Sequence, residues 1–176
     1  MRKPHITSRC WYLLLIMLSF MLVSACSSSS PDSPPTYCLV FDTDRQVNTG
    51  VQRHPLPIKI RTLLLRSDAE FMDADFFSLQ NDTKNVLGNS LLDSDQFFLT
   101  PGQRGKKLQR QKVQDARFIG VIAEYQILNG KVWRLSLSLP RMLTTDADQE
   151  CQSTSDRLGA YIVVGATGLK TININK

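Results

Sequence analysis

The residue types that carry most enzyme chemistry are sparse in this sequence. There are two histidines, and His54 has no Asp or Glu within five positions, which argues against a histidine–carboxylate pair or a multi-histidine metal site. Asp68, Asp73 and Asp75 cluster, but a place early in a predicted helix suits the helix dipole better than a metal. Gly-x-Ser-x-Gly, His-Glu-x-x-His and Cys-x-x-Cys motifs and a phosphate-binding glycine loop are absent. We therefore expect neither catalysis nor a metal or other cofactor, and we expect His54 to lie on a loop surface.

Cys26 has the clearest chemical context. Residues 2–9 carry three basic and no acidic side chains, and residues 11–23 are apolar apart from Ser19. A basic start followed by a short apolar run is typical of an export signal. The run is shorter than the ~20 residues that a membrane span needs. Val23-Ser24-Ala25-Cys26 resembles the lipobox of bacterial lipoproteins, which implies cleavage before Cys26 and acylation of its sulfur and its new amino group. An ordinary cleaved signal and an uncleaved anchor are the alternatives.

The residues after Cys26 indicate a tether. Ser27 occupies the position where an Asp signals inner-membrane retention, and the resemblance to enterobacterial sorting rules therefore favours the outer membrane. Several acyl chains anchor a protein firmly, since each buried CH₂ contributes ~0.8 kcal/mol. We expect a signal peptide at 1–25, a lipidated Ser/Pro-rich tether at 26–35 and a folded domain at 36–176.

The charge balance of the exported chain excludes a general nucleic-acid binder. The chain of 176 residues has 21 Lys and Arg and 16 Asp and Glu, and the signal segment holds three of the basic residues and none of the acidic ones. The exported part is therefore nearly balanced, whereas a nucleic-acid-binding domain is strongly basic.

Cys38 and Cys151 remain once Cys10 leaves with the signal and Cys26 is acylated. Export places them in an oxidising compartment. A disulfide that closes so long a loop stabilises by roughly 4–5 kcal/mol in the chain-entropy model. We expect this disulfide, with two free thiols as the alternative.

Alternating apolar and polar residues predict a domain built mainly of strands. The expected strands are Thr36–Phe41, Pro57–Leu65, Gln96–Leu99, Lys107–Val113, Phe118–Ile127, Val132–Leu139, Gly159–Gly165 and Leu169–Ile174. The first two are joined by a polar, exposed loop at Asp42–Leu56, and 141–156 is expected to be irregular. An inserted helix is predicted to begin at a Ser67-x-x-Glu70 capping box, with Met72, Phe76 and Leu79 on its apolar stripe.

Three further segments carry specific expectations. Residues 81–93 are predicted to form turns around a short helical piece, with Leu87, Leu91 and Leu92 buried. The basic run Arg104, Lys106, Lys107, Arg110 and Lys112 is typical of a solvated edge strand, and a surface for anionic lipid headgroups or an acidic partner is the functional alternative. The apolar row around Trp133 is expected to be core.

The Asn129-Gly130 pair predicts a hairpin in one of two registers. A two-residue loop pairs Tyr125 with Arg134, which sets an apolar face against a polar one. A three-residue loop pairs Tyr125 with Trp133, Ala123 with Leu135, Val121 with Leu137 and Ile119 with Leu139. We favour the three-residue loop, because the buried face decides the register. About seven or eight strands with one inserted helix, and no regular strand–helix alternation, predict a β-sandwich.

Several motifs in a fixed order resemble the TssJ family, the lipoproteins of type VI secretion systems. They are Ala74-Asp75-Phe76-Phe77-Ser78-Leu79, Leu87-Gly88, Leu91-Leu92, Pro101-Gly102, Ile119-Gly120-Val121-Ile122-Ala123-Glu124-Tyr125 and Val132-Trp133-Arg134. The resemblance implies a transthyretin-like β-sandwich with an added helical element. It also implies an outer-membrane anchor on the periplasmic face that binds the periplasmic part of the inner-membrane protein TssM.

In that family the loop between the first two strands contacts TssM. The matching residues here are Val47, Asn48, Thr49, Gly50, Val51, Gln52, Arg53, His54, Pro55, Leu56 and Pro57. A periplasmic inhibitor or ligand carrier is the alternative function, and an enzyme is a third.

Overall fold

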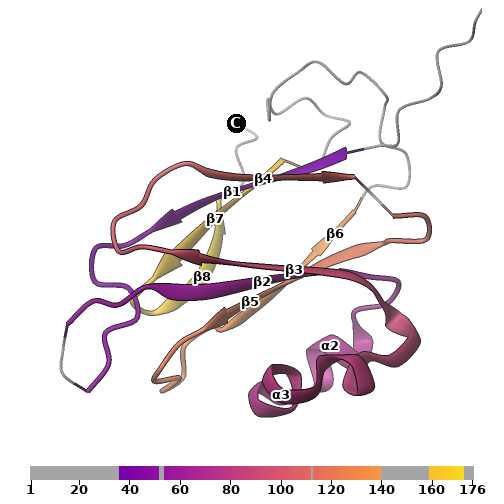
Figure 1. The fold of residues 1–176 in the computed structure, drawn as a ribbon, viewed down its shortest axis with the longest axis horizontal. Helices are drawn as coiled ribbons and strands as arrows, with labels where there is room; N and C mark the ends of the chain where they lie inside the picture. The colour runs from indigo at the N-terminus through magenta and orange to yellow at the C-terminus, as the bar shows by residue number, and fades with distance from the viewer. Residues whose placement is uncertain (1–35, 52–53, 112, 140–158, 173–176) are drawn as a thin grey trace, which may run out of the picture. The chain divides into compact units, whose positions relative to one another are not determined.

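Two four-stranded sheets pack face to face in the computed structural model, which describes residues 36–51, 54–111, 113–139 and 159–172 (Figure 1). One sheet has the order β4-β1-β7-β8 and the other β3-β2-β5-β6. The strands are β1 (Thr36–Thr43), β2 (Ile58–Leu65), β3 (Leu91–Leu99), β4 (Lys106–Gln111), β5 (Phe118–Glu124), β6 (Arg134–Ser138), β7 (Gly159–Gly165) and β8 (Gly168–Ile172). The expected mainly-β sandwich of seven or eight strands is confirmed.

The main core lies between the two sheets and follows directly from the alternation along the strands. Ile58, Ile60 and Leu64 of β2 belong to the same buried cluster as Leu39 and Phe41 of β1. The row around Trp133 contributes as expected, because Ile119, Val121, Ala123 and Tyr125 are buried and Trp133 packs against them half-buried. A core of its own is the usual condition for a domain to fold independently.

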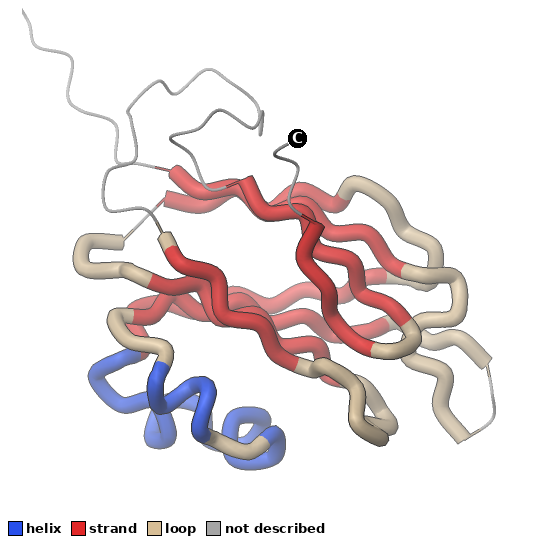
Figure 2. The backbone as a smooth tube through the Cα atoms, turned by 180° about the vertical axis from the view of Figure 1, so that it is seen from behind, coloured by secondary structure: helices blue, strands red, loops and turns tan. Residues whose placement is uncertain are grey.

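The helical insert covers the outer face of the sheet that contains β2 (Figure 2). It consists of α2 (Ala69–Asp73) and α3 (Phe76–Leu87), followed by the 3₁₀ turn η1 (Gly88–Ser90). A second buried cluster joins the insert to the sheet through Leu63, Leu65, Phe71, Phe76, Leu79, Leu87 and Ile122. At Gly120 an added Cβ would lie 3.0 Å from Cζ of Phe71, so the absent side chain lets the ring of Phe71 approach the strand.

The single helix expected from Ser67 is wrong, because the chain breaks at Ala74 and Asp75 caps a second helix. The carboxylate of Asp75 accepts hydrogen bonds from the N–H groups of Phe77 and Ser78, at 2.9 and 3.0 Å. The break rotates the apolar stripe, so that Phe71 is buried whereas Met72 is 44% exposed. The capping box is also wrong: the hydroxyl of Ser67 accepts from the N–H of Ala69.

The turns expected over 81–93 are largely replaced by regular structure. α3 continues to Leu87 across a kink at Asp82, and β3 already begins at Leu91, five residues before the predicted strand. Leu87 is buried as expected, but Leu91 and Leu92 are only half-buried. The reason is their place on β3, an edge strand with a neighbour on one side.

The pairing of β5 with β6 follows neither predicted register. Ile119 lies opposite Leu137 and Val121 opposite Leu135, a shift of two residues from the register that we favoured. The connecting segment is longer than a three-residue loop, since β5 ends at Glu124 and β6 begins at Arg134. A shift of two keeps the same side chains on the buried face, which is why the face was predicted correctly and the partners were not.

Side-chain and backbone contacts close both open sides of the sandwich. On one side the guanidinium of Arg110 on β4 binds the carboxylate of Asp95 on β3 at 2.6 Å. On the other side Val132 and Gly168 form a bridge between the sheets. β4 is an edge strand, as its basic residues indicated. None of the described helices is long and apolar enough to span a membrane.

Candidate partner-binding site

The β1–β2 loop is held at its base by a buried asparagine. Asn48 is 5% exposed and has a left-handed backbone, with φ of 52°. Its side-chain Nδ2 donates to the carbonyl of Pro57 at 2.8 Å, and its Oδ1 accepts from the N–H of Gln126 at 2.9 Å. Asn48 therefore joins the start of the loop to the loop's own end and to the chain after β5.

Asp44 fixes the same end of the domain by joining its own loop to two other segments. Its carbonyl accepts from the N–H groups of Val47 and Gly102, at 3.2 and 3.1 Å. Its carboxylate accepts from the N–H of Ala166 in the β7–β8 turn at 3.3 Å. Val47 itself is fully buried, so the predicted contact segment begins with a residue of the core.

The remaining described part of the loop is exposed and partly apolar. Val51 is 90% exposed and Leu56 is 37% exposed, and His54 lies on the surface as expected. At Gly50 an added Cβ would lie 2.2 Å from Oε1 of Gln126, so a larger residue there would displace the Gln126 side chain. The segment predicted from 47 to 57 thus divides into a buried base and an exposed tip, with Gln52 and Arg53 outside the described residues.

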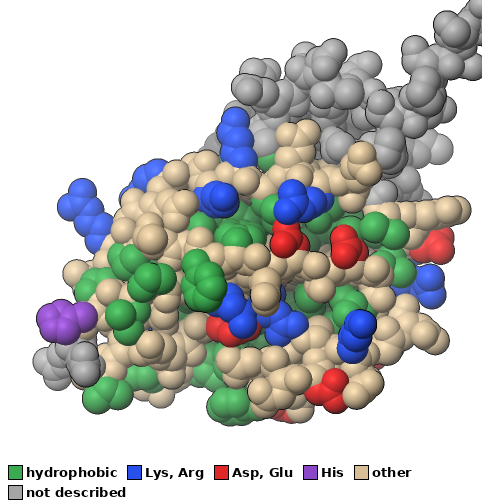
Figure 3. Space-filling view, in the orientation of Figure 1, with side chains coloured by type: hydrophobic (Ala, Val, Ile, Leu, Met, Phe, Trp, Pro, Cys, Tyr) green, Lys and Arg blue, Asp and Glu red, His purple; other side chains and the backbone are tan. Residues whose placement is uncertain are grey.

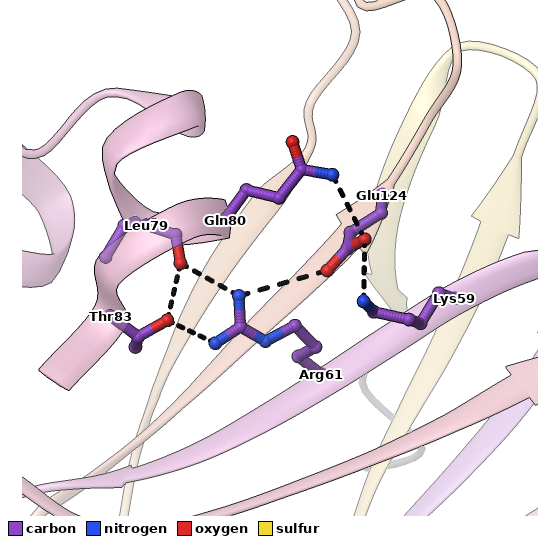
Figure 4. Close-up of polar contacts among 6 residues, drawn as sticks. All are labelled: Lys59, Arg61, Leu79, Gln80, Thr83 and Glu124. Atoms are coloured by element: carbon purple, nitrogen blue, oxygen red, sulfur yellow. Dashed lines mark hydrogen bonds and ion pairs between the residues drawn. The ribbon is translucent and has the colours of Figure 1, made fainter.

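A charged cluster that the sequence analysis did not single out lies on the outer face of β2 beside the loop (Figure 4). Lys59 binds the carboxylate of Glu124 on β5 at 3.0 Å, and Arg61 lies 3.8 Å from the same carboxylate. Arg61 also donates to the carbonyl of Leu79 at 2.8 Å, which ties α3 to the sheet. The alternation of Lys59 and Arg61 with buried neighbours was the signal that could have revealed the cluster.

A buried carboxylate stabilises the opposite sheet near the same end. Asp42 is 4% exposed; its burial alone raises the pKa, but hydrogen bonds from Tyr161, Arg104 and the N–H of Gly105 outweigh burial and hold the pKa of Asp42 below its ordinary value. The Arg104 bond is 2.7 Å long. These bonds are structural contacts between β1, β7 and the turn before β4.

Two of the three acidic residues considered for a metal site have structural roles. Asp75 caps α3 and the carboxylate of Asp68 accepts from the hydroxyl of Ser136 at 2.6 Å. Among the described residues no group of three or more His, Cys, Asp or Glu side chains could hold a metal ion.

The sequence matches the model of one lipoprotein family over more than half of its length. The family model described as type VI secretion lipoprotein, VasD, EvfM, TssJ, VC_A0113 matches residues 35–153. The chain belongs to the TssJ family of type VI secretion lipoproteins. No curated protein matches the sequence.

Solved structures agree with this family. The Serratia marcescens protein Lip, described as a membrane-bound component of the type VI secretion system, is 61% identical, covers 82% of this chain and 100% of its own, and has a TM-score of 0.70. The lipoprotein TssJ1 from Pseudomonas aeruginosa is 21% identical, over 80% and 96% of the two chains, with a TM-score of 0.64. A chain in the structure described as the T6SS protein TssM C-terminal domain from EAEC is 19% identical, over 80% and 99%, with a TM-score of 0.58.

Of the four residues predicted to carry chemistry in this TssJ-family chain, three lie outside the residues that the structure describes. Cys26 and Ser27 precede the described residues, so lipidation and sorting stay predictions. Cys38 is disulfide-bonded, and its expected partner Cys151 lies outside the described residues, so the pairing also stays a prediction.

Proposed function

We propose that this TssJ-family lipoprotein is acylated at Cys26, lies on the periplasmic face of the outer membrane and binds the periplasmic domain of a TssM-like inner-membrane protein through its β1–β2 loop. The observation that carries the proposal is the loop's construction, in which an apolar tip at Val51 and Leu56 stands on a base fixed by Asn48. A fixed base lowers the ordering cost of binding, and exposed apolar side chains supply buried area in a complex.

The position of the loop suits a bridge between two membranes. β1 runs from Thr36, where the tether would join, to the end of the domain that carries the loop (Figure 1). The acyl-anchored end and the loop would therefore use different surfaces. The role is mechanical, without turnover, and the anchor raises the local concentration of the domain at the membrane.

The alternative of a ligand carrier has less support. The hollow between α3 and β3 has a volume of about 480 Å³, but it is open to solvent and is lined by polar and charged residues such as Lys84, Asn85 and Asp93 as well as by leucines. A carrier of apolar ligands uses an enclosed, mostly apolar cavity instead.

A pull-down with residues 27–176 against the periplasmic domain of the cognate TssM-like protein tests the partner. We expect saturable binding that Val51→Ser combined with Leu56→Ser abolishes, because both tip side chains lose their apolar area. Ile172→Ser is the matched control, since Ile172 is 51% exposed on β8. Binding that survives the double change would move the site away from the loop, and an intact domain that never binds would refute the function.

A change at Cys26 tests the anchor separately. We expect Cys26→Ser to give a folded domain that binds the partner in solution and no longer supports secretion, because the acyl chains are lost. Membrane fractionation and a secretion assay provide the readouts. Secretion at the normal level by this variant would contradict the anchoring role.

A further inference from the structure

Phe98 is an exposed aromatic residue on β3 that neither the core nor the loop accounts for. Its side chain is 66% exposed. The preceding residue, Phe97, faces the core and packs edge-to-face against Phe41, with ring centroids 5.2 Å apart. Alternation along the strand therefore directs Phe98 to the outer face of the sheet. Most of the apolar area of Phe98 is therefore available to a partner.

The sheet register places Phe98 next to the candidate site. Phe98 lies opposite Lys59 and Leu99 lies opposite Ile58, the first residue of β2 after the loop. The exposed apolar residues Val51 and Leu56 belong to the loop that enters β2 at this point. Figure 3 shows hydrophobic side chains gathered at the end of the domain that carries this loop. The loop tip and Phe98 can therefore belong to one continuous surface.

The charged cluster beside Phe98 contains two basic side chains and one carboxylate. Lys59 and Arg61 share the single carboxylate of Glu124, at 3.0 and 3.8 Å (Figure 4). Arg61 is held by its bonds to Leu79 and Thr83 on α3, whereas the side chain of Lys59 is 29% exposed. One positive charge remains in excess next to the aromatic ring, so a carboxylate of a partner would be attracted to Lys59.

The size of the loop also argues for a larger surface. A stable protein–protein interface uses about 20–30 residues on each side and ~800 Å² of each partner. The segment from Val47 to Pro57 has eleven residues, and its first two are buried in the domain. A partner that binds the tip must therefore contact neighbouring surface as well, and Phe98 is an exposed aromatic residue beside it.

We propose that Phe98 and Lys59 form a second contact for the partner that binds the loop, and that this contact receives an apolar side chain flanked by a carboxylate. The inference rests on the proposed function, because it assumes the same partner. Aromatic residues near the centre of an interface commonly carry much of its binding energy. Phe98 then supplies affinity, whereas Lys59 supplies electrostatic attraction.

Titration calorimetry between residues 27–176 and the periplasmic domain of the cognate TssM-like protein tests the inference. We expect Phe98→Ala to weaken binding at least tenfold and Phe77→Ala to change it less than twofold. Phe77 is a matched control because it is 64% exposed and lies on α3 beside Phe76, which contacts Trp133 next to the opposite edge strand β6. Lys59→Gln should weaken binding at low salt and reduce its dependence on salt concentration.

The outcomes separate the inference from the function on which it rests. If the loop variants lose binding and Phe98→Ala binds as the unchanged domain does, the second contact is refuted and the loop site stands. If the unchanged, folded domain does not bind at all, the proposed partner and the second contact both fall. Equal losses for Phe98→Ala and Phe77→Ala would also overturn the inference, because they would indicate a general effect of lost apolar surface. Urea unfolding confirms that each variant is folded.

Discussion

Replacing Asn48 should destabilise the whole domain, although the residue lies in a loop. Asn48→Ala removes two buried hydrogen bonds, to the carbonyl of Pro57 and from the N–H of Gln126. Each such bond contributes about 1 kcal/mol. Alanine at a φ of 52° adds a backbone penalty of roughly 1–2 kcal/mol, because alanine lacks the short polar side chain whose local hydrogen bonds let asparagine adopt this left-handed backbone. We expect the free energy of unfolding to fall by about 3–4 kcal/mol.

A glycine at the same position separates the two contributions. Asn48→Gly loses the same hydrogen bonds but adopts the left-handed backbone without strain. It should therefore lower the free energy of unfolding by about 2 kcal/mol. Asn129→Ala is the control, because Asn129 also has positive φ, at 29°, but is exposed and makes no side-chain hydrogen bond to the described residues. Asn129→Ala should lower the free energy of unfolding only by the backbone penalty of roughly 1–2 kcal/mol, about 2 kcal/mol less than Asn48→Ala.

Urea unfolding of residues 27–176, followed by tryptophan fluorescence, measures these differences. The slope of the free energy against urea concentration should stay constant while the midpoint shifts. If Asn48→Ala and Asn129→Ala unfold at the same midpoint, the hydrogen bonds of Asn48 do not hold the loop base. If Asn48→Gly is as stable as the unchanged domain, the side chain of Asn48 has no structural role.

Three further predictions concern other buried groups. Burial raises the pKa of Tyr37 to about 12, so the contribution of Tyr37 to the free energy of unfolding is complete below pH 10 and is lost as pH rises from about 10 to 12. Tyr37→Phe should flatten this loss, which urea unfolding midpoints across that pH range measure. The pKa of Asp42 is lowered in the folded domain. The contribution of its carboxylate to the free energy of unfolding is therefore present above the unfolded-state pKa near 3.8 and is lost as pH falls through the lower folded value. Asp42→Asn should therefore reduce the loss of stability between pH 5 and 2, and an unchanged acid limb would contradict this. Gly120→Val should lower the free energy of unfolding by about 1–3 kcal/mol, because the new Cβ would lie 3.0 Å from Phe71 and 3.2 Å from Leu65. An unchanged thermal unfolding temperature would contradict this and would mean that the helical insert shifts to make room.

The fold was predictable because most strands keep a period of two and bury one face. Errors arose where tertiary contacts override the local pattern. Phe71 rather than Met72 is buried because Asp75 starts a new helix and resets the phase of the apolar stripe. The register of β5 with β6 depends on the length of the connecting segment, which a single Asn-Gly pair does not determine.

The candidate site was predictable as a segment but not in its internal organisation. Polarity and the prolines indicated an exposed loop between the first two strands. The buried role of Asn48 depends on the N–H of Gln126, which lies 78 positions later in the chain, and no local pattern encodes that contact. Phe98 follows the same logic, since its cross-strand neighbour on the outer face, Lys59, comes from β2 rather than from β3 itself.

The construction of the loop separates residues that fold the domain from residues that can bind a partner. Replacing an exposed apolar side chain such as Val51 should change the stability of the isolated domain little, because no core contact is lost. Asn48 and Val47 hold the base, so changes there lower stability and also raise the cost of ordering the tip for binding. Weak binding by a base variant therefore does not identify a contact residue, whereas weak binding by a tip variant of unchanged stability does. Contacts at this site must be assigned from binding and unfolding measured on the same variants.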